Sequence, residues 1–190
     1  IDAEVKLPEG YHVEMGGQFE SEQAASRTLL VASLMSIVVI FLLIYTEFKN
    51  AAQSAVILLN LPLALIGGVF ALLITSGEVS IPAIIGFISL FGIATRNGML
   101  LIGRYNNLRA EGGSLRESII HGSLDRLNPI LMTALTSALA LIPLAFRGDL
   151  PGNEIQSPMA KVILGGLLTS TFLNAFIIPI VYELMNRKKK

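Results

Sequence analysis

The sequence predicts an all-α membrane protein with five transmembrane helices. Apolar residues make up 53% of the chain and charged residues only 15%, whereas soluble domains carry roughly 25% charged residues. The apolar residues also form long blocks that lack the period of a surface helix. Each of five blocks is long enough to cross about 30 Å of hydrocarbon at about 1.5 Å per residue. The predicted spans are residues 28–46, 52–76, 81–103, 128–146 and 160–184.

The composition also excludes several classes of function. The chain contains no cysteine, which excludes a disulfide framework and thiolate metal sites. Its net charge of zero gives no reason to expect nucleic acid as a partner. No nucleophile and base pair, phosphate-binding loop or cluster of metal ligands is recognisable. We therefore expect no enzyme, no cofactor and no metal-binding residues within this chain.

Residues 1–27 differ in composition from the spans that follow. Six acidic side chains face two basic ones in this segment, and Tyr11–Met15 alternates as a strand does before Gly16 and Gly17 interrupt it. We interpret residues 1–27 as the end of an external soluble α/β segment. From about Glu20 a helix is expected to run without interruption into the first span.

Three of the spans carry stripes of small or weakly polar residues at helical spacing. Such stripes let helices approach closely and hydrogen-bond in lipid, so we expect the spans to pack into a bundle. The stripes are Asn60, Ala64, Gly67, Gly68 and Ala71 in the second span, Thr133, Thr136, Ser137 and Ala140 in the fourth, and Gly166, Ser170 and Asn174 in the fifth.

The third span contains a charge. Arg96 is the only ionisable residue between Ile81 and Ile102, and Thr95 and Asn97 flank it. A charge inside a membrane span is costly and usually marks a transport pathway. The alternative is a side chain that extends to the inner headgroups.

The segment between the third and fourth spans carries a helix-start signal. Gly112 and Gly113 are followed by Ser114 and Glu117, the spacing of a capping box. Apolar residues then recur on one helical face. We therefore predict a short amphipathic helix over residues 114–124 that lies along the inner membrane surface and connects the two spans.

Lysine and arginine are unevenly distributed between the two ends of the spans. Short cytoplasmic loops are enriched in both residue types. With Lys49 placed inside, nine basic residues fall on the inner side and four on the outer side. The amino-terminal end is then outside, and the basic tail, residues 187–190, is inside. Because the number of spans is odd and the chain begins at Ile1, we expect it to be part of a longer protein.

Counting residues from the inner boundary places two polar side chains at one depth. Arg96 lies eight residues before Arg104, roughly 12 Å, and Thr133 lies seven residues after Arg126, roughly 10 Å. If the third and fourth spans are neighbours, Arg96 and Thr133 could share one polar site. Arginine keeps its proton in proteins, so Arg96 would act as a fixed positive charge. A carboxylate that titrates would then have to come from another part of the protein.

Several runs of residues resemble a known family. Three of them are similar to the carboxyl-terminal membrane half of a resistance-nodulation-division efflux pump, and three more resemble the heavy-metal efflux branch of that superfamily. The first three are Gly92–Ile102, Arg126–Thr133 and Asn60–Gly68, and the second three are Leu7–Tyr11, Gly16–Glu20 and Gly152–Gln156.

This resemblance implies an architecture and an activity. Such pumps are homotrimers of twelve-span protomers in the inner membrane of Gram-negative bacteria. They exchange protons for substrate, here heavy-metal cations of the Cu/Ag or Zn/Co/Cd class, and pass it to a periplasmic adaptor and an outer-membrane channel. Residues 1–27 would end the second periplasmic (porter) loop, residues 28–186 would form the last five spans, and the missing half of the chain would supply the relay carboxylates.

The resemblance also implies roles for individual residues. In the family, acids on a first-half span pair with a basic or acidic residue on the tenth span and a hydroxyl on the eleventh. Arg96 and Thr133 fall at these two positions, with Asn97 and Arg126 in supporting positions. Many relatives have lysine or glutamate where this chain has Arg96, and unlike lysine an arginine cannot release its proton.

Two alternative functions remain open from the sequence. A multidrug or lipid exporter would share the membrane machinery and differ in the external loops. A non-transporting membrane assembly module would use Arg96 as a tie between helices, so that replacing it would destabilise the protein.

Overall fold

The structure of the protein is a computed structural model that describes residues 18–75, 79–148, 152–153 and 155–187. Five helices account for nearly all of them: α1 (Gln18–Phe48), α2 (Ala51–Thr75), α3 (Ile81–Ala110), α4 (Leu115–Phe146) and α5 (Gln156–Arg187). All five are long and apolar enough to cross a membrane, which confirms the predicted class of an all-helical fold with five membrane-capable helices. The described part contains no strand, and the strand predicted over Tyr11–Met15 lies outside it. Helix α1 begins at Gln18, which confirms the helix expected from about Glu20.

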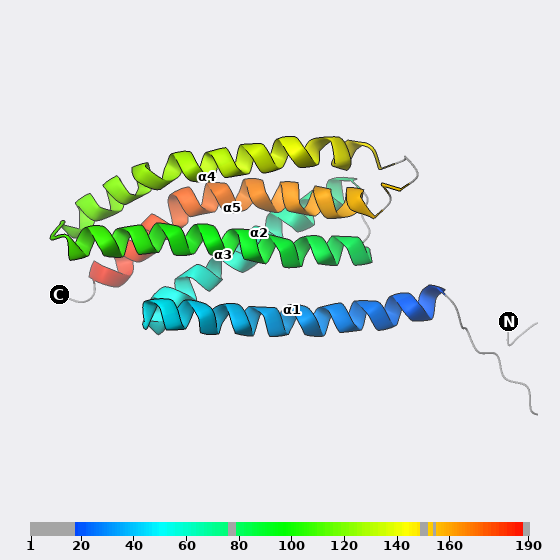
Figure 1. Ribbon diagram of the computed structural model, residues 1–190, viewed down its shortest axis with the longest axis horizontal. Coiled ribbons are helices and arrows are strands. Elements are labelled where there is room, and N and C mark those ends of the chain that lie inside the picture. Colours follow the sequence, from blue (N-terminus) through cyan, green and yellow to red (C-terminus); the bar gives the residue numbers. More distant parts are fainter. Residues whose placement is uncertain (1–17, 76–78, 149–151, 154, 188–190) are drawn as a thin grey trace, which may run out of the picture.

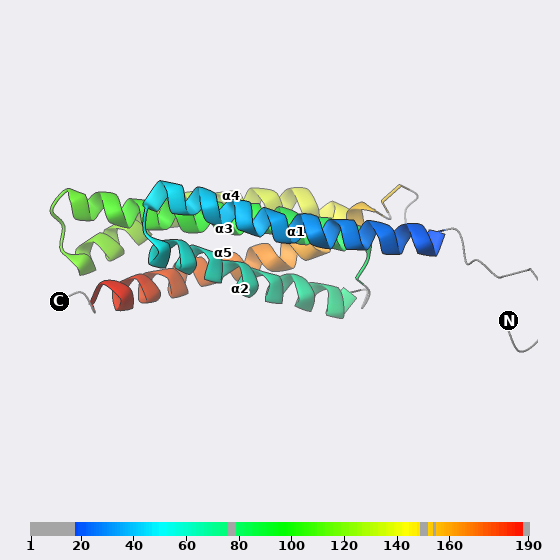
Figure 2. The ribbon, with the colours of Figure 1, turned by 90° about the horizontal axis from the view of Figure 1, so that it is seen from below.

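The five helices form a bundle in which α3 contacts all four of the other helices. Helix α5 packs against α2, α3 and α4, whereas α1 packs only against α2 and α3. In Figure 1, α3, α4 and α5 run side by side along the long axis and α1 lies at one edge. In the view of Figure 2, α2 lies next to α5, and both lie below α1 and α3.

Part of the small-residue stripe predicted in the second span lies where α2 meets α5, whereas Thr133, Thr136 and Ala140 of the stripe predicted in the fourth span are exposed on α4. The backbone of α5 approaches Gly67 so closely that a Cβ there would lie 2.5 Å from the Gly165 carbonyl oxygen, and a Cβ on Gly165 would clash with the carbonyl of Gly67. Neither position has room for any side chain. The two helices are therefore in direct backbone contact, as small residues permit in lipid.

The capping box is confirmed at the start of α4. The Ser114 hydroxyl accepts a hydrogen bond from the Glu117 backbone N–H at 3.3 Å, and the Glu117 carboxylate accepts one from the Ser114 N–H at 3.2 Å. The hydrogen bonds from Ser114 lower the pKa of Glu117, because they stabilise its ionised form. Gly112 has φ +95°, which is the left-handed conformation that glycine adopts without strain.

The prediction of a separate connecting helix over residues 114–124 is wrong. Helix α4 continues without a break from Leu115 through the fourth span to Phe146, with Pro129 inside it. No glycine lies between Ser123 and Pro129 to end the helix. The segment also packs on a protein helix, since Gly122 lies against the ring of Tyr105 on α3 and Ile119 is buried there.

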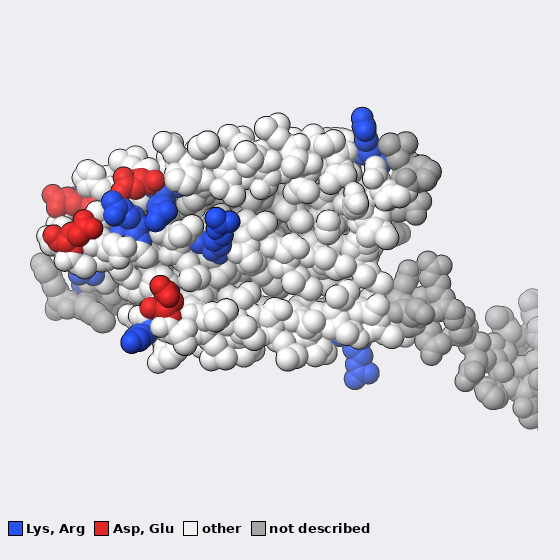
Figure 3. Space-filling view, in the orientation of Figure 1, with Lys and Arg blue, Asp and Glu red and all other residues white. Residues whose placement is uncertain are grey.

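Charged side chains gather at the end of the bundle that holds the α3–α4 connection, which we call the basic end (Figure 3). An ion pair joins the two helices there: the Arg104 guanidinium donates to one carboxylate oxygen of Asp125 at 2.7 and 2.9 Å. Polar contacts also link Gln53 on α2, Asn106 on α3 and Tyr182 on α5. The loops that the sequence assigned to one side of the membrane therefore do lie at one end.

Replacing Gly67 with alanine should destabilise the bundle, because the added methyl group meets the Thr169 side chain and also the Gly165 carbonyl oxygen, a backbone atom that cannot move to another rotamer. Overpacking of this kind costs about 1–3 kcal/mol. The matched control is Gly103→Ala at the basic end of α3, where nothing lies within 4 Å of the added Cβ and alanine is the better helix former. Thermal unfolding of the detergent-solubilised full-length protein should show a lower Tm for Gly67→Ala only. Equal Tm values would contradict the close approach of α2 and α5.

Candidate transport site

Arg96 lies on the uncovered face of α3. Exposed residues recur along this helix at intervals of three and four, and Arg96 stands among apolar and small side chains. The stripe consists of Ile85, Ser89, Gly92, Arg96 and Leu100. Among the described residues Arg96 has no hydrogen-bond or ion-pair partner, whereas its neighbours Thr95 and Asn97 are buried. The charge predicted from the sequence is therefore present, but it points away from the core of these five helices.

Thr133 also lies on the surface of the bundle. It is exposed on α4, and its hydroxyl donates to the Pro129 carbonyl one turn earlier at 2.8 Å. Arg126, half-buried, is seven residues before Thr133, which is about two turns on the same side of the helix. The structure does not bring Thr133 into contact with Arg96.

The ion pair at the basic end allows the depths of Arg96 and Thr133 to be compared. Arg104 and Asp125 are in contact across α3 and α4, so they mark one level in both helices. Arg96 is eight residues from Arg104, and Thr133 is eight residues from Asp125, which is about 12 Å in each case. Helices α3 and α4 are neighbours, which was the condition for this estimate. The two side chains are therefore at the same depth on adjacent helices.

The sequence did not predict a buried polar contact close to Arg96. The Asn60 side-chain amide on α2 donates to the Asn174 side-chain oxygen on α5 at 2.7 Å and to the Ala94 carbonyl on α3 at 3.3 Å. Both asparagines are at most 3% exposed. Both had been recognised only as members of the small-residue stripes, and an amide within such a stripe is the signal that could have indicated the pairing.

This contact ties the backbone of α3, two residues before Arg96, to α2 and α5. Lipid offers no competing hydrogen bonds, so a hydrogen bond between two membrane helices contributes to the stability of the bundle. Breaking it leaves a buried amide without a partner. The two asparagines therefore help to fix the position of α3 in the bundle, and with it the position of Arg96.

Long apolar helices, close helix contacts and a charge inside one span are features of a helical membrane transporter. The AcrB/AcrD/AcrF family model matches residues 1–186. The chain therefore belongs to this family, which confirms the predicted resemblance to resistance-nodulation-division efflux pumps.

Individual relatives are proteins of heavy-metal resistance. The chain is 40% identical over 190 residues to the nickel-cobalt-cadmium resistance protein NccA of Alcaligenes xylosoxydans xylosoxydans, covering 100% of the chain and 18% of that protein. It is 39% identical over 188 residues to the cobalt-zinc-cadmium resistance protein CzcA of Cupriavidus metallidurans, covering 99% of the chain and 18% of that protein.

A solved structure shows the same fold. The crystal structure of a heavy metal efflux pump, crystal form II, superimposes with a TM-score of 0.82 at 38% identity, over 98% of this chain and 18% of that chain. The chain thus spans less than a fifth of the length of the proteins that it matches. The likeness to heavy-metal efflux pumps extends over essentially all of its residues.

Asn60→Leu and Asn174→Leu should each destabilise the bundle, because Asn60→Leu leaves the buried Asn174 amide unpaired and Asn174→Leu removes one of the two hydrogen bonds of the buried Asn60 amide. The cost of such a group is about 1–3 kcal/mol. The double variant should lose less than the sum of the two, since it leaves neither amide behind. The measurement is a double-mutant cycle on the unfolding of the full-length protein. Thr136→Val, which removes an exposed hydroxyl bonded to its own helix, is the control, and strictly additive effects would contradict the contact.

Proposed function

We propose that the chain is part of a proton-driven transporter that exports heavy-metal cations. The observation that carries this proposal is Arg96 on an uncovered face of α3. An arginine at the centre of a helix facing hydrocarbon costs about 2.5–3.5 kcal/mol on insertion scales. A second part of the protein that covers this face would remove the cost if it carried carboxylates. The described residues supply no acid on that stripe, so we assign the acids to another part of the protein.

The charge of Arg96 suggests how protons drive movement. Ionised carboxylates from the other half would pair with the guanidinium, and protonation would remove the attraction. A charge pair that protonation makes and breaks can drive a two-state change. Arginine itself stays protonated, so the acid is the proton carrier. An acid next to a fixed cation has a lowered pKa, and desolvation in the pocket would have to offset this effect.

Thr133 and the Asn60–Asn174 contact would take part in the movement that follows protonation of the acid. Thr133 is at the depth of Arg96 and would exchange hydrogen-bond partners when the acid changes state, with Asn97 and Arg126 in support. Asn60 links the α3 backbone beside Arg96 to α2 and α5. A displacement of α3 would therefore carry α2 and α5 with it as one unit.

The names of the relatives favour a class of substrate. NccA and CzcA are named for resistance to nickel, cobalt, zinc and cadmium, so we propose divalent ions of this class in preference to Cu(I) or Ag(I). No group of three or more metal-ligating side chains of His, Cys, Asp or Glu occurs among the described residues. We propose that the metal ion binds in another part of the full-length protein.

The assembly that we propose is that of an inner-membrane pump. The protein would be a homotrimer that works with a periplasmic adaptor and an outer-membrane channel. Residues 1–27 would close the porter loop, with the amino-terminal end of the chain in the periplasm and the carboxyl-terminal end in the cytoplasm. The distribution of basic residues supports this orientation.

Metal-driven proton flux tests the proposal. Full-length protein in proteoliposomes should move protons when Zn(II), Co(II), Ni(II) or Cd(II) is added, and Arg96→Ala should reduce this flux at least tenfold because the acids lose their counter-charge. The signal is the fluorescence of a pH-sensitive dye inside the vesicles. Arg116→Ala, an exposed arginine outside the span, is the matched control and should keep wild-type flux.

Other outcomes would identify the alternatives. Flux driven by an organic dye and not by metals would indicate a multidrug exporter, and flux driven by Cu(I) or Ag(I) alone would overturn the substrate class. Unchanged flux in a trimeric Arg96→Ala variant would exclude Arg96 from the relay. Loss of the trimer in that variant, with no metal-driven flux in the wild type, would indicate an assembly module.

A further inference from the structure

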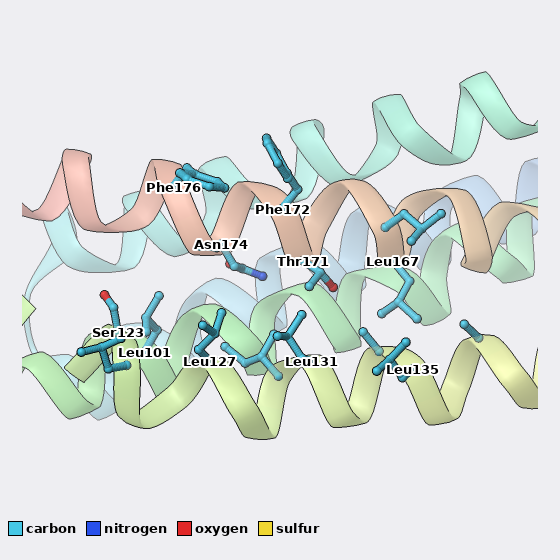
Figure 4. A pocket seen from close by; sticks show the side chains of 16 residues that line it. Leu101, Ser123, Leu127, Leu131, Leu135, Leu167, Thr171, Phe172, Asn174 and Phe176 are labelled. Atoms are coloured by element: carbon cyan, nitrogen blue, oxygen red, sulfur yellow. The ribbon is translucent and has the colours of Figure 1, made fainter. Parts of the chain in front are cut away.

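Helix α4 is held to the bundle near its two ends, with a groove beside it in between. At the end opposite the basic end, the buried Ser157 hydroxyl of α5 donates to the Ala145 carbonyl of α4 at 3.1 Å. Between the ends lies a groove of about 510 Å³, lined by residues of α3, α4 and α5. Figure 4 shows Ser123 at one end of this groove and leucines of α4 along its wall. Contacts near the two ends therefore largely determine where the middle of α4, including Thr133, lies.

A buried tyrosine makes the contact with α4 at the basic end. Tyr105 on α3 is fully buried, and its hydroxyl lies 2.6 Å from the Ser123 hydroxyl of α4. A Cβ on Gly122 would lie only 2.6 Å from the Tyr105 ring, so the ring touches the α4 backbone. The Arg104–Asp125 ion pair nearby is exposed, and exposed pairs contribute little to stability. Because Tyr105 is buried by this chain alone, its contact with α4 does not depend on any other part of the protein.

Tyr105 is itself held by two further helices. Its ring packs against the ring of Tyr182 on α5, with 5.0 Å between the ring centroids. The Tyr182 hydroxyl donates to the side-chain oxygen of Asn106 on α3 at 2.7 Å. Asn106 and Gln53 on α2 exchange two hydrogen bonds between their side-chain amides. Tyr105 therefore has a fixed position relative to α2 and α5, and α4 is positioned against it.

The contact at Tyr105 sets the level of Thr133 along the bundle. Tyr105 is nine residues from Arg96 on α3, and Ser123 is ten residues from Thr133 on α4, which is about 14 and 15 Å. Helix α4 is continuous between Ser123 and Thr133. A bend at Pro129 would tilt the segment that follows it but would hardly change its position along the helix axis. Tyr105 thus opposes sliding of α4 along α3.

We propose that Tyr105 is a positioning residue for transport, which holds Thr133 at the level of Arg96. This inference rests on the proposed function, in which Thr133 exchanges hydrogen-bond partners as the acid next to Arg96 changes its protonation state. A hydrogen bond from Thr133 to the ionised acid lowers the pKa of that acid. When α4 slides, Thr133 no longer reaches the acid, and the pKa of the acid rises.

The pH profile of Zn(II)-driven proton flux tests this role in proteoliposomes that contain the full-length protein. Tyr105→Phe keeps the ring and removes the hydroxyl. The pH of half-maximal flux should then rise by about 0.5, part of the change of about 1 that complete loss of one hydrogen bond to a carboxylate causes. Ser123→Ala removes the same hydrogen bond from the other helix and should give the same rise.

A second background separates positioning from a general loss of stability. Thr133→Val should raise the pH of half-maximal flux by about 1, since the acid loses the whole hydrogen bond. Adding Tyr105→Phe to Thr133→Val should cause no further rise, because Tyr105 acts through Thr133. Tyr45→Phe is the matched control, since Tyr45 is 45% exposed on α1, and it should keep the wild-type profile.

A distance measurement distinguishes a failure of this inference from a failure of the proposed function. Spin labels at Asn107 of α3 and Leu139 of α4, both exposed, report sliding of one helix along the other. Pulsed electron paramagnetic resonance on the full-length protein should give a broader or displaced distance distribution for Tyr105→Phe than for the wild type. If the wild type shows no Zn(II)-driven flux, the proposed function is wrong, and the labels still decide whether Tyr105 fixes α4. An unchanged distribution in Tyr105→Phe, or a further pH rise in the Thr133→Val background, would overturn the inference.

Discussion

The close approach of α2 and α5 at Gly67 and Gly165 determines how the bundle is built. In lipid the hydrophobic effect does not press helices together, so association depends on packing and hydrogen bonds. With no side chain between the two backbones, Asn60 and Asn174, two to three turns further along, come within hydrogen-bond distance. Larger residues at the glycines would hold these amides apart. The polar contact is thus a consequence of the packing contact.

The same arrangement explains why α3 has two different faces. One face is held by Asn60 through the Ala94 carbonyl and packs against α2 and α5, and the opposite face carries Arg96. The buried face is complete within the described residues, with its apolar side chains in contact with neighbouring helices. The opposite face has no such cover. Helix α3 is thus held by its neighbours on one face and carries an uncovered charge on the other. This arrangement suits a helix that moves relative to another part of the protein.

The sequence predicted the fold well, and the roles of the candidate site residues stay a prediction. Hydropathy identified all five spans, and a capping box of two residues located the start of α4, because both signals are local. The continuity of α4 was missed, since it depends on Gly122 packing against Tyr105 of another helix. Arg96 was identified from its cost in lipid, but which way it points is set by the rotation of α3 in the bundle. The two amides within the stripes were a signal for a polar contact, but the Asn60–Asn174 pairing itself was missed because periodicity does not specify which helices meet.

The unbroken length of α4 has a mechanical consequence. Its 32 residues extend roughly 48 Å, well beyond a hydrocarbon layer of about 30 Å, so the helix either tilts or protrudes. Thr133 is 18 residues from Leu115, a lever arm of roughly 27 Å. A rotation of about 5° at the level of Thr133 would displace the capping-box end by roughly 2 Å over that arm. A continuous helix carries part of a small change at the polar level to the membrane surface, and Pro129 is the place within this arm where a backbone hydrogen bond is missing and the helix can bend.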